Sequence, residues 1–253
     1  MNGTTRTGPL ALALVLGLVA LGACKTATTT GTDGSLMSFS GAVSQGGQSF
    51  PAVDVFLSWG ASRTAATGSD GRFAFNDLPG GSYIVTPSKI GYAFSPSYFE
   101  VGTGARNDLN FTATAASYGT DEGSVALDFT AKNQNGVDVT LSSYHGKVIL
   151  LDFTADWCGP CREKAETSEA FYQSLKDKGF VYILCVIEGS AKTWSETYNL
   201  SFPVLDDNSH AVYNNFRRNS IPLPHILDRN RTIRYKREGY IKAEVEDTLK
   251  KYF

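Results

Sequence analysis

The second half of the chain alternates long apolar runs with amphipathic stretches. Two near-continuous apolar runs, Lys147–Phe153 and Phe180–Ile187, are typical of strands that are buried on both faces of a sheet. Between them, residues 162–178 are rich in Glu, Lys and Ala and predict a helix. Residues 226–252 predict a hairpin and then a closing helix. This order of elements predicts a three-layer α/β/α domain over residues 117–253.

Residues 36–116 have a different pattern, in which short runs alternate between apolar and polar positions. Val53–Leu57, Arg72–Phe75 and Ser82–Val85 are such runs, and turn signals rich in Gly, Asp and Pro separate them. This block holds 9 charged residues in 81, against 36 in the 137 residues that follow. We therefore expect a small all-β sandwich that precedes the α/β domain.

The N-terminus has the pattern of an export signal. The apolar run at residues 10–21 is shorter than the ~20 residues that a membrane-spanning helix needs. It ends in Leu21-Gly22-Ala23-Cys24, which resembles the lipobox of bacterial lipoproteins. That resemblance implies a lipoprotein signal peptide over residues 1–23 and lipidation of Cys24. An ordinary signal that is cleaved near Ala23 is the alternative. Residues 24–35 are rich in Thr, Gly and Ser and predict a flexible tether.

Composition and charge exclude several classes of function. Lys and Arg total 23 against 25 Asp and Glu, and a net charge of −2 gives no basic surface for nucleic acid. Four cysteines are too few for a disulfide scaffold, and three scattered histidines argue against a His-rich metal site. We therefore expect neither a metal nor a cofactor. The predicted hairpin carries five basic residues, which we expect on a solvated edge rather than in a docking patch: Arg229, Arg231, Arg234, Lys236 and Arg237.

One short motif carries the chemistry. Trp157-Cys158-Gly159-Pro160-Cys161 lies where the first apolar strand meets the first helix, which is the place of a thioredoxin-like redox motif. The spacing brings both sulfur atoms to one face of the helix, close enough for a disulfide. Cys158 comes first, where free N–H groups and the helix dipole favour a thiolate, and we expect Cys161 to be more buried. Pro160 suits the first helical turn.

Two other interpretations of the cysteine pair are weaker. A structural zinc site needs a second Cys or His pair at a suitable spacing, and the sequence has none. An inert structural disulfide rarely lies in such a motif at a strand–helix junction. Cys185 falls in the middle of the second apolar run, where we expect a core residue.

Around this motif, residues 118–253 resemble the exported thioredoxin-fold proteins of the TlpA/ResA-like and AhpC/TSA-like group. The segments Leu141–Gly146 and Phe202–Asp206 also follow the pattern of that group. The resemblance implies that Asp152, a buried acid, exchanges a proton with Cys161. A carboxyl group buried in this way has a raised pKa and can act as a general base. Replacement by Asn would then slow turnover and raise stability.

The same resemblance implies a cis-proline that faces the disulfide. Pro222 and Pro224 are both candidates, and counting back six residues from Asp228 favours Pro222. We expect His225 to be a strand-end side chain and not a catalytic base. The sandwich, over about residues 37–113, resembles the carboxypeptidase regulatory-like domains of exported bacterial proteins.

These observations predict a lipid-anchored, extracytoplasmic thiol–disulfide oxidoreductase. Its expected partners are a protein disulfide substrate, a membrane electron donor and the membrane itself. A thiol peroxidase is the first alternative, but the Pro and Thr that its motif needs are replaced by Leu151 and Ala155. In the second alternative, the sandwich is a binding or adhesion module and the redox domain is its accessory.

Overall fold

The computed structural model describes residues 36–216 and 220–253. The expected signal peptide (1–23), the expected lipidation site Cys24 and the expected tether (24–35) lie outside the described residues. Within these ranges, every helix is too short or too polar to cross a lipid bilayer.

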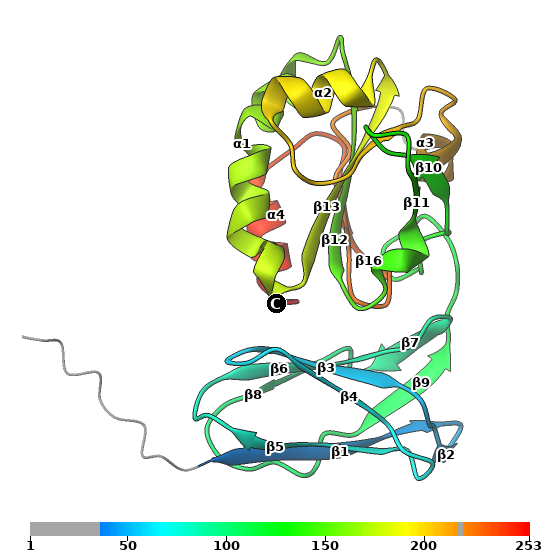
Figure 1. Ribbon diagram of the computed structural model, residues 1–253. Coiled ribbons are helices and arrows are strands. Elements are labelled where there is room, and N and C mark those ends of the chain that lie inside the picture. Colours follow the sequence, from blue (N-terminus) through cyan, green and yellow to red (C-terminus); the bar gives the residue numbers. More distant parts are fainter. Residues whose placement is uncertain (1–35, 217–219) are drawn as a thin grey trace, which may run out of the picture. The chain divides into compact units, whose positions relative to one another are not determined.

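The N-terminal part is a β-sandwich of two sheets (Figure 1). Its strands are β1 (Met37–Gln45), β2 (Gln48–Ser49), β3 (Asp54–Trp59), β4 (Arg63–Ala66), β5 (Arg72–Leu78), β6 (Tyr83–Ser88), β7 (Tyr92–Ser95), β8 (Phe99–Val101) and β9 (Phe111–Ala115). One sheet has the order β2-β1-β9-β7 with β5 paired to β1, and the other has the order β4-β3-β6-β8. Alternate side chains such as Phe73 and Phe75 of β5 point into a core that also contains Phe39, Tyr83 and Phe111. The expected all-β sandwich is confirmed.

The C-terminal part is the predicted three-layer α/β/α domain. Its elements are β10 (Thr130–Lys132), β11 (Asp138–Thr140), a 3₁₀ helix (Leu141–Tyr144), β12 (Val148–Ala155), α1 (Gly159–Leu175), a second 3₁₀ helix (Lys176–Lys178), β13 (Phe180–Glu188), α2 (Ala191–Tyr198), β14 (Val204–Asp206), α3 (Ala211–Phe216), β15 (His225–Leu227), β16 (Ile233–Lys236) and α4 (Lys242–Leu249). The central sheet has the order β14-β13-β12-β15-β16. Strands β14, β13 and β12 are parallel, whereas β15 and β16 run antiparallel to their neighbours. Helices α1, α2 and α4 pack on one face, and α3 packs on the other (Figure 1).

Strand alternation decides which side chains of β12 face helix α1. Val148 and Leu150 pack in the cluster under α1, while Ile149, Leu151 and Phe153 pack in the cluster on the opposite face. Asp152 follows Leu150 by two positions, so it lies on the α1 face. On the neighbouring strand β13, Tyr182 pairs with Leu150 and belongs to the same cluster. The sheet therefore places Asp152 and Tyr182 together beneath α1.

The expectation of a solvated basic hairpin is wrong at two of its positions. Arg229 is 5% exposed and Arg231 is 3% exposed. The Arg229 guanidinium donates a 2.7 Å hydrogen bond to the carbonyl of Gly146, and Arg231 pairs with the carboxylate of Asp128 at 3.3 Å. A charged side chain can be buried where such partners are available, and the sequence pattern did not identify them.

Candidate functional site

The two cysteines of the motif form a disulfide at the start of helix α1. Cys158 and Cys161 are bonded, with their Cα atoms 5.3 Å apart. Cys158 is the N-cap residue, and its sulfur accepts a 3.3 Å hydrogen bond from the backbone N–H of Cys161. The helix begins at Gly159 rather than at residue 162, because this cap and Pro160 in the first turn extend it toward the motif. The 17-residue helix directs its N-terminal N–H groups and the positive end of its dipole toward Cys158.

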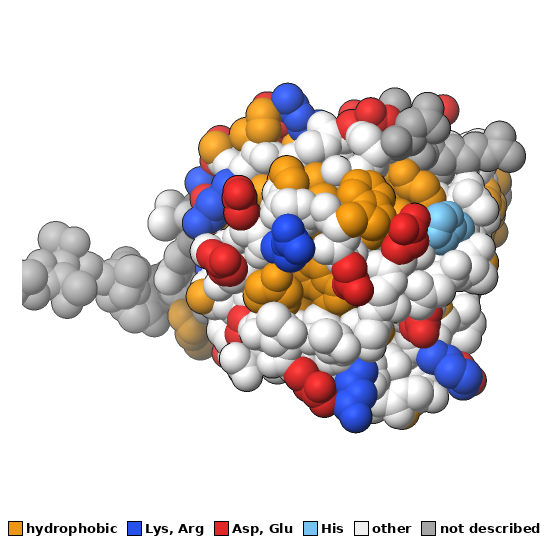
Figure 2. Space-filling view, turned by 90° about the horizontal axis from the view of Figure 1, so that it is seen from above, with side chains coloured by type: hydrophobic (Ala, Val, Ile, Leu, Met, Phe, Trp, Pro, Cys, Tyr) orange, Lys and Arg blue, Asp and Glu red, His pale blue; other side chains and the backbone are white. Residues whose placement is uncertain are grey.

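Both sulfur-bearing residues are nearly closed off from solvent in this oxidised state. Cys158 is 3% exposed and Cys161 is 1% exposed, so the expected order holds but the difference is small. The neighbouring Trp157 is 62% exposed, and its indole N–H donates a 2.9 Å hydrogen bond to the carboxylate of Glu188. Figure 2 looks down on the end of the sheet that carries the disulfide, where hydrophobic side chains are exposed among charged ones.

A cis-proline loop lies against the disulfide. The peptide bond between Ile221 and Pro222 is cis, so Pro222 rather than Pro224 is the cis-proline of this loop. The carbonyl oxygen of Ile221 is 3.9 Å from the sulfur of Cys158. The carbonyl of Pro222 accepts a 2.9 Å hydrogen bond from the N–H of Gly239, which ties the loop to the segment before α4. This hydrogen bond therefore fixes the backbone of the loop that lies next to Cys158.

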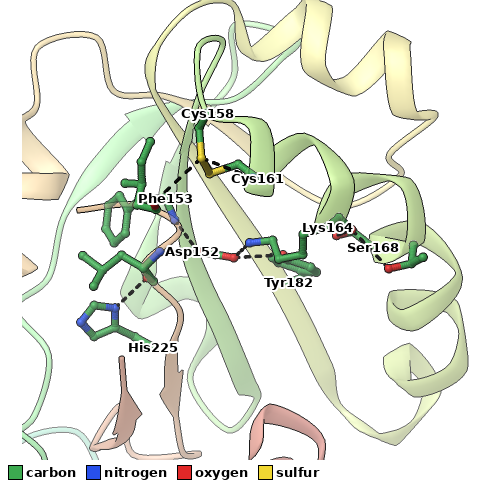
Figure 3. Close-up of polar contacts among 11 residues, drawn as sticks. Asp152, Phe153, Cys158, Cys161, Lys164, Ser168, Tyr182 and His225 are labelled. Atoms are coloured by element: carbon green, nitrogen blue, oxygen red, sulfur yellow. Dashed lines mark hydrogen bonds and ion pairs between the residues drawn. A yellow bond between two sulfur atoms is a disulfide. The ribbon is translucent and has the colours of Figure 1, made fainter. Parts of the chain in front are cut away.

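Asp152 is completely buried below the disulfide (Figure 3). One carboxylate oxygen accepts hydrogen bonds from the N–H groups of Phe153 at 2.8 Å and Leu223 at 3.1 Å. The other accepts a 3.3 Å hydrogen bond from the hydroxyl of Tyr182 and contacts the Nζ atom of Lys164. These four donors stabilise the ionised carboxylate and oppose the effect of its burial.

Lys164 is the site residue that sequence reasoning missed. Its side chain is only 4% exposed and is paired with Asp152, which is 0% exposed. Burial lowers the pKa of Lys164 to about 7. Lys164 follows Cys161 by three positions, a spacing that places both residues on one face of a helix. That spacing was a signal that could have identified it.

An open groove lies beside the disulfide, with a volume of about 560 Å³. Pro160, Glu163 and Lys164 of α1 line one wall, and residues 220–222 and 238–240 line the other. Lys164 thus lines the groove, while its Nζ atom is buried and contacts Asp152. Asp152 is not among the residues that line this groove.

His225 and Cys185 lie away from the sulfur chemistry. His225 is fully buried on β15, and its Nδ1 atom is 3.2 Å from the carbonyl oxygen of Leu223. Cys185 is a free thiol in the middle of β13, and burial raises its pKa well above the ordinary value. Over residues 36–216 and 220–253, no group of three or more His, Cys, Asp or Glu side chains is placed to hold a metal ion.

Two parts of the chain match known families. Residues 123–236 match the AhpC/TSA family, and residues 38–114 match the carboxypeptidase regulatory-like domain. The thioredoxin-like protein YneN of Bacillus subtilis is 32% identical over 150 residues, which cover 56% of this chain and 86% of that protein. The thiol-disulfide oxidoreductase ResA of Geobacillus kaustophilus is 31% identical over 133 residues, which cover 51% of this chain and 71% of that protein. Among solved structures, the thioredoxin domain of a thiol-disulfide oxidoreductase from Bacteroides vulgatus has 23% identity and a TM-score of 0.47, and the match covers 52% of this chain and 97% of that domain.

Proposed function

The chain belongs to the thioredoxin-like thiol–disulfide oxidoreductases, and we propose that it reduces disulfide bonds of extracytoplasmic proteins with the dithiol of Cys158 and Cys161. The observation that carries this proposal is the disulfide at the N-terminus of α1, with the carbonyl of Ile221 3.9 Å from the Cys158 sulfur. The loop that contains Ile221 presents backbone groups to a substrate chain beside the Cys158 sulfur.

In the reduced protein, Cys158 is the nucleophile. The helix N-terminus stabilises its thiolate, which attacks one sulfur of the substrate disulfide and releases the other as a thiolate. Cys161 then loses its proton and attacks Cys158 in the mixed disulfide. This second step forms the Cys158–Cys161 disulfide of the present structure and leaves the substrate as a dithiol. Two electrons have moved from the protein to the substrate.

Asp152 is the base that takes the proton from Cys161. Its carboxylate lies on the α1 face of β12, the face on which Cys161 also packs. The donors around the carboxylate fix its orientation beneath α1. Pro222 fixes the loop that presents backbone to the substrate, and Trp157 offers an exposed apolar contact beside Cys158.

The location of this activity follows from the N-terminal sequence. We place the protein in the bacterial cell envelope, lipid-anchored through Cys24 and facing the periplasm or the exterior. Disulfides persist in that compartment, so the oxidised protein needs an electron donor in the membrane to return it to the dithiol. Residues 24–35 would connect both domains to the lipid anchor at Cys24.

Turnover of a protein disulfide tests the proposal. The prereduced protein should reduce insulin disulfides in the presence of a dithiol, and Cys158→Ser should abolish this turnover. Cys185→Ala is the matched control, because Cys185 is a buried thiol of the same domain that is outside the site. A Cys158→Ser protein that turns over at the wild-type rate would contradict the proposal.

A further inference from the structure

A loop of only two residues separates β12 from the nucleophile. Asp156 and Trp157 connect the end of β12 to Cys158, the N-cap residue of α1. In the oxidised protein the disulfide also links Cys158 to Cys161 within α1. That link is absent from the dithiol, which is the form that attacks a substrate disulfide. The position of Cys158 in the reactive form therefore depends on the contacts that hold this loop.

Asp156 is held through its N–H group, its carbonyl group and its carboxylate. The N–H group donates a 2.9 Å hydrogen bond to the carbonyl of Glu188 at the end of β13. The carbonyl accepts a 3.1 Å hydrogen bond from the guanidinium of Arg162 on α1. The carboxylate accepts a 2.6 Å hydrogen bond from the indole N–H of Trp194 on α2. Three elements of the domain are therefore joined at this one residue.

The fold prepares the contact between Trp194 and Asp156 from both sides. Trp194 is 3% exposed and packs in the same core cluster as Cys158 and Cys161, so packing holds its indole N–H in one place. Gly189 follows β13, and a Cβ atom at this position would overlap the carboxylate of Asp156. The missing side chain at Gly189 therefore leaves the space that the carboxylate occupies when it accepts the indole N–H.

We propose that Trp194 and Asp156 are positioning residues, which fix the loop that carries Cys158 at the N-terminus of α1. This inference rests on the proposed function. Trp194 acts through the carboxylate of Asp156, and Asp156 acts through the position of Cys158. The Cys158 sulfur accepts a 3.3 Å hydrogen bond from the N–H of Cys161. A cysteine displaced from the N-cap would lose this donor and the positive end of the helix dipole, both of which stabilise its thiolate.

The position and the charge of Asp156 have opposite effects on Cys158, so substitution can separate them. Removal of the carboxylate takes away a negative charge near Cys158, and this change alone favours the thiolate and lowers the pH at which Cys158 is alkylated. Loss of the anchor moves Cys158 away from the helix N-terminus and raises that pH. Asp156→Asn removes the charge but keeps an oxygen atom that can accept the indole N–H. The other charged side chains that bond to this loop among the described residues are Glu188 and Arg162, and every variant keeps them.

The experiment compares Asp156→Ala, Asp156→Asn and Trp194→Phe with the control Glu196→Ala, which removes an exposed carboxylate of α2 that pairs with Lys192. Each reduced variant is first checked for a cooperative thermal transition. Alkylation of Cys158 by iodoacetamide is then followed over pH by peptide mapping, and insulin reduction gives kcat/KM. We expect Asp156→Ala and Trp194→Phe to raise the pH midpoint of alkylation and to lower kcat/KM at least about tenfold, as a misplaced reacting group does. Asp156→Asn and Glu196→Ala should not raise the midpoint and should keep kcat/KM close to the wild-type value.

Other outcomes would overturn the positioning role. A midpoint that falls in both Asp156→Ala and Asp156→Asn would show that only the charge matters. An unchanged midpoint in Asp156→Ala, with or without a lower melting temperature, would exclude positioning. If Trp194→Phe does not fold, the two variants of the exposed Asp156 decide the question. Failure of the proposed function has a different signature, since the wild-type protein would then not reduce insulin, whereas the alkylation profiles would still test the position of Cys158.

Discussion

The substitution Asp152→Asn tests how the buried ion pair between Asp152 and Lys164 changes the stability of the protein with pH. Asn has the size of Asp, and its Oδ1 atom can still accept the N–H groups of Phe153 and Leu223. The side chain of Lys164 is 4% exposed, and in the variant it loses the carboxylate that its Nζ atom contacts. The lost carboxylate favoured the ammonium, so the pKa of Lys164, which burial already lowers, falls further in the variant.

The direction of the effect on stability follows from proton linkage. A lysine whose pKa is lowered by folding binds its proton more tightly in the unfolded chain, so stability rises with pH between the folded and the unfolded pKa. In the wild type this rise begins near pH 7, and in the variant it begins lower. Below pH 7 the variant is therefore less stable than the wild type, by up to about 1.4 kcal/mol for each pH unit. This differs from the rise in stability expected from the sequence, because that expectation did not include the contact between Asp152 and Lys164.

Above pH 7 the sign changes. Lys164 is then neutral in both proteins, and the variant no longer buries a carboxylate, so it should be at least as stable as the wild type. Denaturant melts of the oxidised proteins from pH 5 to 9 measure this crossover, with the exposed Glu166→Gln on the same helix as a control. A difference that stays constant over pH, or a variant that is more stable at pH 5, would refute the reasoning.

Three further predictions concern other parts of the chain. Cys24→Ser should move the protein from the membrane fraction to the soluble fraction or block its processing, and normal processing with unchanged fractionation would contradict the lipid anchor. Gly189→Ala should lower stability by about 1–3 kcal/mol in thermal melts, because φ is +131° there and a Cβ atom would displace the Asp156 carboxylate. A melting temperature equal to that of the wild type would contradict this placement. Deletion of residues 36–116 should leave insulin turnover intact, whereas loss of turnover in a folded deletion protein would favour the sandwich as the working module.

The sequence predicted the architecture of both domains because hydrophobic periodicity reports burial directly. The run at residues 147–153 became β12 and the run at 180–187 became β13, each within two residues at either end. Helices α2 and α3 were not predicted. They have eight and six residues, so each has too few turns for a clear apolar face.

The site was predictable where a local pattern specifies the chemistry. The pair Cys158 and Cys161 needed only the motif and its position between a strand and a helix. Asp152 was identified through the resemblance to thioredoxin-fold proteins. The partner of Asp152 was missed because a segment that is rich in Glu and Lys predicts an exposed face. The spacing of Lys164 from Cys161 indicated only that both residues share one face of the helix. Lys164 is buried because the sheet beneath α1 supplies a carboxylate, and that pairing exists only in the folded chain. The buried Arg229 was missed for the same reason.

The measurement that tests the central claim most directly is the trapping of a mixed disulfide. Reduced Cys161→Ser is mixed with a protein disulfide substrate, and the product is examined by intact mass and peptide mapping. Cys158 should form a covalent adduct that persists until a small thiol is added, because the thiol that would resolve it has been removed. The absence of an adduct, or an adduct on Cys185 instead, would contradict the assignment of Cys158 as the attacking thiol.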